Sequence, residues 1–240
     1  MIKVDTDRVK YSSQEKGVAE LKIYAHRGVS ARHPENTLEA FQAAVDAGVY
    51  GVELDIHCSA DGLPVVIHDD RLERTTNGAG SVTERTVSEL RAIDAGNGQY
   101  VPTFEEVVAL ADGRLHVDIE IKGKNCEQGV LDVLAAYPNT RAAISSFDWK
   151  VLANVRALDP DFELWVLTST ISDDAIATAN GLGATALAVN HRTIDRAEMT
   201  RASDAGLDVM AWTVNSQKEA DRLRELGVVA ICTDDPLEVH

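Results

Sequence analysis

The chain has few of the features that mark secreted or membrane-spanning proteins. Among its 240 residues only Cys58, Cys126 and Cys232 are cysteines, and their wide spacing fits neither a zinc motif nor a disulfide framework. No stretch approaches the roughly 18 consecutive apolar residues of a membrane helix, and no segment near the start resembles a signal peptide. We therefore expect a cytoplasmic protein without stable membrane insertion, whose cysteines are small apolar side chains in the core.

Positive charge is also scarce. The sequence has 23 lysines and arginines against 39 aspartates and glutamates, which gives a formal net charge of -16. A balance of this sign argues against non-specific binding to nucleic acid or to anionic membranes. It is compatible with a small anionic substrate, provided that a metal ion or a few well-placed cations attract that substrate locally.

From Leu21 onward, short apolar runs alternate with amphipathic segments, which indicates βα units and a parallel sheet. Strands are predicted to begin at Lys22, Val49, Leu115, Ala142, Phe162, Ala184, Leu207 and Val228. Eight such units predict an α/β fold, a TIM (β/α)8 barrel in a single domain. The alternative is a doubly wound open sheet, although the Gly-rich first turn that often accompanies it is absent.

The predicted barrel has three departures from a regular repeat. Residues 1–21 show little periodicity and are expected to form an N-terminal strap, with the barrel domain spanning 22–240. Residues 69–100 are rich in Thr, Gly and Asn, which predicts a short insertion after the second strand. The sequence ends soon after the last predicted strand, so the eighth helix is expected to be truncated or missing.

Two neighbouring predicted strands carry carboxylates. Glu53 and Asp55 are two residues apart and therefore point to the same face of their strand. Glu120 ends the next barrel strand. Three carboxylates from two strands match a site for Mg²⁺ or Ca²⁺, which prefer oxygen ligands. The alternative is a patch of salt bridges with Arg27 and Lys122.

Two histidines lie close to these carboxylates. His26 and His68 each end a short apolar run, and imidazole exchanges protons near neutral pH, so the pair is suited to acid and base catalysis. Each of them alone also fits a hydrogen-bonded histidine of the core. His57 shares a strand face with Glu53 and is expected at the mouth of the barrel without a catalytic role. Structural or solvent-facing roles are expected for His33, His116, His191 and His240.

Polar residues end most of the predicted strands. Examples are Ser145, Asn190, Asn215 and Asp234. The carboxyl ends of the strands carry the active sites of TIM barrels. Since a purely structural core does not require polar side chains there, this convergence favours an enzyme.

Several motifs in fixed order resemble those of the glycerophosphodiester phosphodiesterases, of the short bacterial kind. The matching segments are HRG at 26–28, PENT at 34–37, ELD at 53–55, DGLPVVIHD at 61–69, EIK at 120–122, WTVN at 212–215 and TDDP at 233–236. The resemblance extends from Lys22 to Pro236. It implies a TIM barrel and metal-dependent hydrolysis of a small glycerophosphodiester to sn-glycerol 3-phosphate and an alcohol.

The resemblance also implies roles for individual residues. His26 and His68 would be the general acid and base. Glu53, Asp55 and Glu120 would bind Mg²⁺ or Ca²⁺. Arg27 and Lys122 would contact the phosphate, and Phe147 and Trp212 would line the glycerol or alcohol side. The nucleophile is either water or the 2-hydroxyl of glycerol. Alternatives on the same barrel are a phosphodiesterase of the lysophospholipase D or sphingomyelinase D type, and a protein that binds a phosphodiester without turnover.

Overall fold

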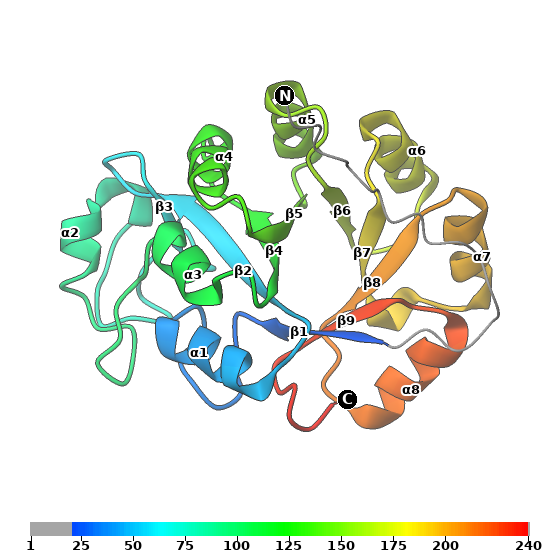
Figure 1. Ribbon diagram of the computed structural model, residues 1–240, viewed down its shortest axis with the longest axis horizontal. Helices are drawn as coiled ribbons and strands as arrows, with labels where there is room; N and C mark the ends of the chain where they lie inside the picture. The colour runs from blue at the N-terminus through cyan, green and yellow to red at the C-terminus, as the bar shows by residue number, and fades with distance from the viewer. Residues whose placement is uncertain (1–20, 240) are drawn as a thin grey trace, which may run out of the picture.

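A computed structural model describes residues 21–239, and it forms a closed barrel of parallel strands surrounded by helices (Figure 1). The eight barrel strands are β1 (Lys22–His26), β2 (Gly51–Cys58), β4 (His116–Ile121), β5 (Arg141–Ser146), β6 (Leu164–Thr168), β7 (Ala186–Asn190), β8 (Asp208–Trp212) and β9 (Ala230–Thr233). Pairing of β1 with both β2 and β9 closes the ring. The predicted TIM barrel is thus confirmed. The predicted strap lies outside the described residues, except for Leu21.

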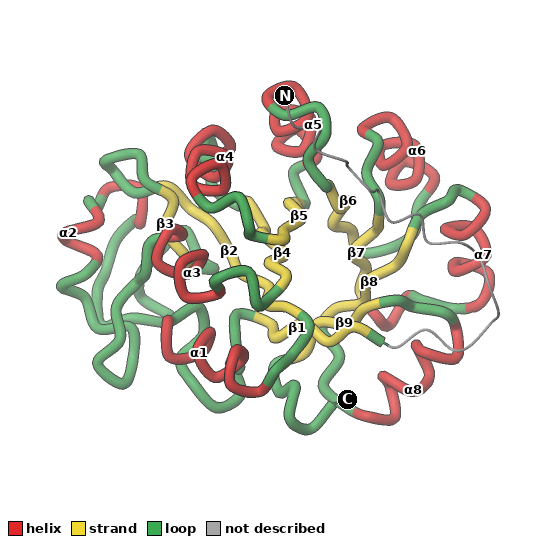
Figure 2. The backbone as a smooth tube through the Cα atoms, viewed as in Figure 1, coloured by secondary structure: helices red, strands yellow, loops and turns green. Residues whose placement is uncertain are grey.

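Helices cover the outer surface of the ring (Figure 2). Those between successive barrel strands are α1 (Leu38–Ala47), α3 (Phe104–Ala111), α4 (Glu127–Ala136), α5 (Trp149–Leu158), α6 (Asp173–Leu182), α7 (Arg196–Asp204) and α8 (Gln217–Leu226). Most of them begin at a polar cap. The side chains of Thr103 and Glu106, for example, form a capping box at the start of α3. Gly48, in the left-handed conformation at φ 66°, ends α1.

The segment between β2 and β4 is the largest departure from the repeat. Strand β3 (Pro64–Val66) pairs antiparallel with β2 and extends the sheet beyond the barrel. The insertion that follows contains the short helix α2 (Val87–Leu90) and a 3₁₀ turn, Val82–Glu84. It has a small core of its own, formed by Val65, Ile67, Leu72, Val82, Leu90 and Val101. This core gives the insertion a fixed shape beside the carboxyl end of β2.

The last strand is followed by a turn. Within residues 21–239 no helix comes after β9, as the sequence predicts. The same part of the chain contains no helix that is both long and apolar enough to cross a bilayer.

The barrel interior changes character along its axis. Near the amino-terminal ends of the strands, the ring of His116 lies between those of Tyr50 and Trp165, with centroids 5.9 Å and 5.6 Å away. Tyr24 meets His116 and Trp165 edge-on. Further along, the interior is lined by small or flexible side chains such as Ala188 and Met210. The aromatic layer fills one end of the barrel, while the other end is left to polar groups.

His116 is held neutral by its surroundings. Its side chain is buried, and its Nδ1 forms a hydrogen bond of 3.1 Å with the Tyr24 hydroxyl. Burial, together with the positive charges of Arg141 and Lys22, lowers the pKa of His116 from 6.5 to about 4. The unfolded chain therefore binds a proton at His116 in a pH range where the folded chain does not.

We predict that this histidine destabilises the fold in weak acid. Above pH 6.5 the histidine is neutral in both the folded and the unfolded chain and has no effect of this kind. As the pH falls from 6.5 to 4, the free energy of unfolding decreases progressively by about 3 kcal/mol. His116→Phe keeps a ring in the stack and removes the titration. Urea unfolding between pH 7.5 and 4 should show a flatter pH dependence for this variant than for the wild type.

The matched control is His33→Ala, since the His33 imidazole is partly exposed and pairs with Glu39 outside the barrel interior. It should keep the wild-type pH dependence of the unfolding free energy. Identical curves for His116→Phe and the wild type would contradict the prediction.

Candidate active site

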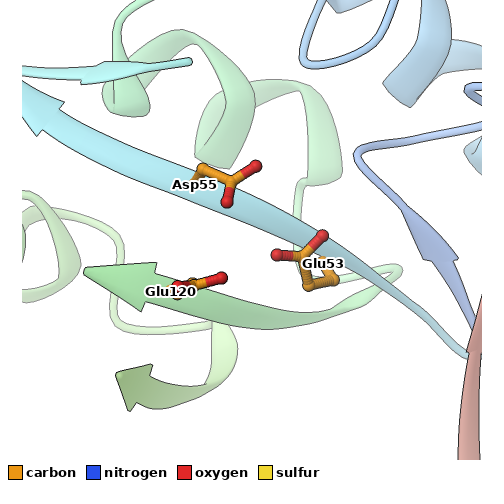
Figure 3. Close-up of side chains that lie close together, drawn as sticks. All are labelled: Glu53, Asp55 and Glu120. Atoms are coloured by element: carbon orange, nitrogen blue, oxygen red, sulfur yellow. The ribbon is translucent and has the colours of Figure 1, made fainter. Parts of the chain in front are cut away.

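Three carboxylates converge at the carboxyl end of the barrel (Figure 3). Glu53 and Asp55 lie on β2 and Glu120 on β4, and the parallel register sets Asp55 directly opposite Glu120. One oxygen from each side chain lies within 4.8 Å of the other two, and all three residues are buried. The period of two and the pairing of β2 with β4 therefore bring together the set predicted from the sequence.

Burial and mutual repulsion disturb the ionisation of this cluster. Desolvation and the negative charge of Asp55 raise the pKa of Glu120 to about 7, and the same two causes raise that of Glu53. Burial also opposes ionisation of Asp55, but Arg27 and Lys122 outweigh it and lower its pKa. Additional positive charge at the cluster would allow all three carboxylates to ionise together.

The cluster fits a divalent cation. Its donors are all carboxylate oxygens, the ligand type of Mg²⁺ and Ca²⁺. Oδ1 of Asp55 is buried without a hydrogen bond among the described residues, with Lys122 Nζ 3.5 Å away, while Oδ2 accepts from Asn36 at 2.8 Å. An unpaired carboxylate oxygen costs free energy unless a cation or a donor satisfies it. Glu53, Asp55 and Glu120 could therefore hold such an ion.

The two predicted histidines approach the cluster from different strands. His26, at the end of β1, donates from Nδ1 to Asp234 Oδ1 at 2.6 Å, and its Nε2 lies 3.8 Å from Glu53 Oε2. His68 follows β3 and donates from Nδ1 to Asp69 Oδ1 at 2.5 Å. Because a carboxylate only accepts, each Nδ1 carries a proton and each Nε2 is left for exchange.

Two cations stand beside the carboxylates. Lys122 Nζ lies 3.1 Å from Glu120 Oε1 and donates to Nε2 of His68 across 3.1 Å. Arg27 Nε is 3.3 Å from Asp55 Oδ2. The backbone places this arginine: Arg27 has a φ of 58°, and its N–H donates to Glu53 Oε2 at 3.1 Å.

Gly28 makes the turn at Arg27 sterically allowed. A Cβ at this position would lie 2.6 Å from the carbonyl carbon of Ala40, at a φ of 80°. Only glycine fits such a close backbone approach. The HRG segment is therefore a tight turn that presents His26 and Arg27 to the same site.

A hollow of about 230 Å³ opens onto these groups. One side is charged and is lined by His26, Arg27, Glu53, His68, Asp118, Glu120 and Lys122. The opposite side is apolar and includes Leu167, Ala188, Met210 and the two predicted aromatic residues, Phe147 and Trp212. The rings of Phe147 and Trp212 meet edge-on with centroids 5.6 Å apart, and Phe147 is half-exposed at the rim.

Asp118 was not part of the predicted metal set, although the period of two places it on the same face as Glu120. It lines the hollow beneath the cluster and accepts from the Ser145 hydroxyl at 2.7 Å. Burial raises its pKa to about 7. When Asp118 is deprotonated, it adds a fourth negative charge to those of Glu53, Asp55 and Glu120.

The hydrogen-bond partners of the two histidines could not be predicted from local patterns in the sequence. Asp234 lies 208 positions from His26 in the sequence. Asp69 follows His68 directly, but adjacency alone does not predict a hydrogen bond between the two side chains. His57 was expected at the mouth of the barrel, but it does not line the hollow. Its Nε2 instead lies 3.1 Å from the His68 backbone carbonyl oxygen.

The remaining histidines lie elsewhere. His33 pairs with Glu39, and His191 pairs with Glu219 at 2.8 Å. His116 belongs to the aromatic layer, and His240 is outside the described residues.

Comparison with known proteins gives consistent matches over most of the chain. A family model described as the glycerophosphoryl diester phosphodiesterase family matches residues 26–238. Relatives named glycerophosphodiester phosphodiesterase from Bacillus altitudinis and Caldanaerobacter subterraneus subsp. tengcongensis are 34% and 33% identical. The alignments cover 90% and 89% of this chain, and 95% and 94% of the relatives.

A solved structure has the same fold. An Oleispira antarctica phosphodiesterase, in complex with the product sn-glycerol-3-phosphate, is similar with a TM-score of 0.86 and 28% identity. The similarity covers 90% of this chain and 93% of that one.

We predict that a divalent cation stabilises the folded protein through the acidic cluster. At a concentration one hundred times its Kd, a ligand that binds only the folded state should raise the melting temperature of a chain of this size by about 5 to 10 °C. Glu53→Gln keeps an acceptor for the Arg27 N–H and should fold, but it should respond less to Mg²⁺ or Ca²⁺. Thermal melts in EDTA and in each cation measure this directly.

The control for this test is Asp161→Asn, which removes an exposed carboxylate in the loop before β6. This variant should keep the full cation response. An undiminished response in Glu53→Gln would place the cation elsewhere.

Proposed function

The chain belongs to the glycerophosphoryl diester phosphodiesterase family and is a phosphoric diester hydrolase, and we propose that it hydrolyses glycerophosphodiesters to sn-glycerol 3-phosphate and an alcohol in a cation-dependent reaction. The observation that carries this proposal is the position of His26 and His68 on either side of the buried carboxylates in one hollow. The product bound by the Oleispira antarctica enzyme supports the same substrate class.

The charged side of the hollow is suited to a phosphodiester. When bound by Glu53, Asp55 and Glu120, a divalent cation would neutralise negative charge on the phosphate oxygens. Arg27 and Lys122 add fixed positive charge to the same place, where charge builds up during phosphoryl transfer.

The hydrogen bonds of the two histidines favour different roles. Nε2 of His68 accepts from Lys122 and is therefore unprotonated, so we assign it to remove the proton from the nucleophile. Nε2 of His26 lies 3.8 Å from Glu53 Oε2 on the opposite side of the cluster, so we assign it the remaining role, protonation of the leaving alkoxide. Asp69 and Asp234 hold the two rings in the required tautomers.

The apolar side of the hollow is assigned to the organic part of the substrate. Phe147 and Trp212 form the wall next to the rim, and Trp212 Nε1 is a buried donor without a partner among the described residues. A hydroxyl of the substrate could accept from it. The small volume of the hollow favours a short alcohol over an acyl chain.

We predict that glycerol 3-phosphate is released from glycerophosphocholine or glycerophosphoethanolamine in the presence of Mg²⁺ or Ca²⁺. Treatment with EDTA should abolish the release, and restoring the cation should recover it, because the anionic cluster otherwise repels the phosphate. A coupled assay for glycerol 3-phosphate measures both states. Release that persists in EDTA would contradict a cation requirement, and faster hydrolysis of lysophosphatidylcholine would contradict the substrate class.

We predict that His26→Ala and His68→Ala each lower kcat by about 10²–10⁴-fold, as expected for loss of a general acid or base. His191→Ala is the matched control, because His191 Nδ1 also pairs with a carboxylate, that of Glu219, but His191 does not line the hollow. It should retain wild-type turnover. Unchanged turnover in either His26→Ala or His68→Ala would overturn the assignment.

A further inference from the structure

One side chain of the insertion reaches the active site. Arg74 forms four hydrogen bonds with two carboxylates. Its Nε and Nη2 donate to the two oxygens of Asp69 at 2.7 Å and 2.9 Å. Its Nη1 and Nη2 donate to the two oxygens of Glu35 at 2.9 Å each. One guanidinium therefore binds both carboxylates in the two-pronged manner that only arginine provides.

Each of these carboxylates holds a residue of the proposed machinery. Asp69 accepts the Nδ1 proton of His68, and Glu35 accepts from Nη1 of Arg27 at 2.9 Å. Arg74 thus lies at the centre of a continuous chain of charged contacts. At one end is the proposed general base, and at the other is the arginine that faces the phosphate.

Arg74 is itself held in place by the core of the insertion. Leu72, two positions earlier, is fully buried in that core. Its carbonyl accepts from the Thr76 hydroxyl at 2.7 Å and from the Thr76 N–H at 3.1 Å. The Leu72 N–H donates to the carbonyl of Gly80 at 3.1 Å. Arg74 therefore lies within a hydrogen-bonded turn that begins at the buried Leu72 and ends at the partly buried Thr76.

The charge of Arg74 explains why two carboxylates can lie so close together. Nη2 touches both Glu35 and Asp69, so removal of the guanidinium would leave two negative groups facing each other. Asp69 would lose the donors that fix its orientation, and His68 would lose a firmly held acceptor. Glu35 would keep its contact with Arg27. The larger effect is therefore expected at His68.

The other histidine is held differently. Asp234, the partner of His26, accepts from the neutral groups Asn215 Nδ2 at 2.5 Å and Ser30 Oγ at 3.4 Å. Neither contact involves Arg74. An effect of Arg74 on catalysis should consequently act through His68 and not through His26.

We propose that Arg74 is a positioning residue for this reaction: by clamping Asp69 and Glu35 together, it fixes His68 in register with Arg27. This inference rests on the proposed function. It assigns to the insertion a role in catalysis, because the small core of the insertion holds the turn that carries Arg74.

The test compares Arg74→Ala with Arg71→Ala. Arg71 lies on the same loop, and within residues 21–239 its side chain forms an ion pair only with the exposed Glu73. With glycerophosphocholine as substrate, kcat of Arg74→Ala should fall by about 10- to 100-fold, as is common for groups that orient a catalytic residue. Arg71→Ala should stay within about two-fold of the wild type, as expected for a surface ion pair.

A double-mutant cycle distinguishes positioning from general damage. If Arg74 acts through His68, the double mutant Arg74→Ala/His68→Ala should have a kcat less than about two-fold below that of His68→Ala. In the His26→Ala background, Arg74→Ala should still cause most of the decrease in kcat that it causes alone. Millimolar guanidinium ion should partly restore kcat of Arg74→Ala, and methylammonium should not. Arg74→Lys, which keeps the charge but not the fork, should lose activity and still melt like the wild type.

Three results would overturn the inference. These are unchanged kcat in Arg74→Ala, additive losses with His68→Ala, and failure of guanidinium to restore a folded Arg74→Ala enzyme. All of them require an active wild type. A wild type that does not hydrolyse the substrate would instead refute the proposed function on which the inference rests.

Discussion

The active end of this barrel is organised by buried negative charge. Four carboxylates share it: Glu53, Asp55, Asp118 and Glu120. They lie on two adjacent strands, and only Arg27 and Lys122 supply neighbouring permanent positive charge within the described residues. Repulsion at this distance is tolerated in a folded protein only if a cation or protons balance it. The turn that places Arg27 beside Asp55, and the Asp55 oxygen that lacks a hydrogen bond, are consistent with this need.

A second constraint is that the groups facing the hollow are held by other polar groups. Asn36 fixes Asp55, Ser145 fixes Asp118, and separate aspartates fix the two histidines. Such support keeps reacting groups in place without reorganisation during the reaction. Asn36, Asp69 and Asp234 come from the loops after β1, β3 and β9, and Ser145 lies at the end of β5.

The sequence predicts the barrel well because its signals are local. Alternating strand and helix patterns, polar caps such as Thr103 and the period of two in β2 each depend on only a few neighbouring residues. The carboxylate set could be predicted for the same reason. The link from Asp234 to His26, the bridge made by Arg74 and the antiparallel pairing of β3 all join segments by tertiary packing, so no local pattern announces them. The sequence predicts a structural role for His116 but not its ring stack, because the rings of the aromatic layer come from four separate segments of the chain.

The aromatic layer closes the amino-terminal end of the barrel, so the barrel is not an open channel. Tyr24, His116 and Trp165 close its base, so substrate and products use the same rim, beside Phe147 and Trp212. On the proposed chemistry, the phosphate-bearing product keeps its contacts with Arg27 and Lys122 and leaves past the same rim. Because product and substrate would share these cationic groups, the anionic product is expected to compete with the substrate for the hollow.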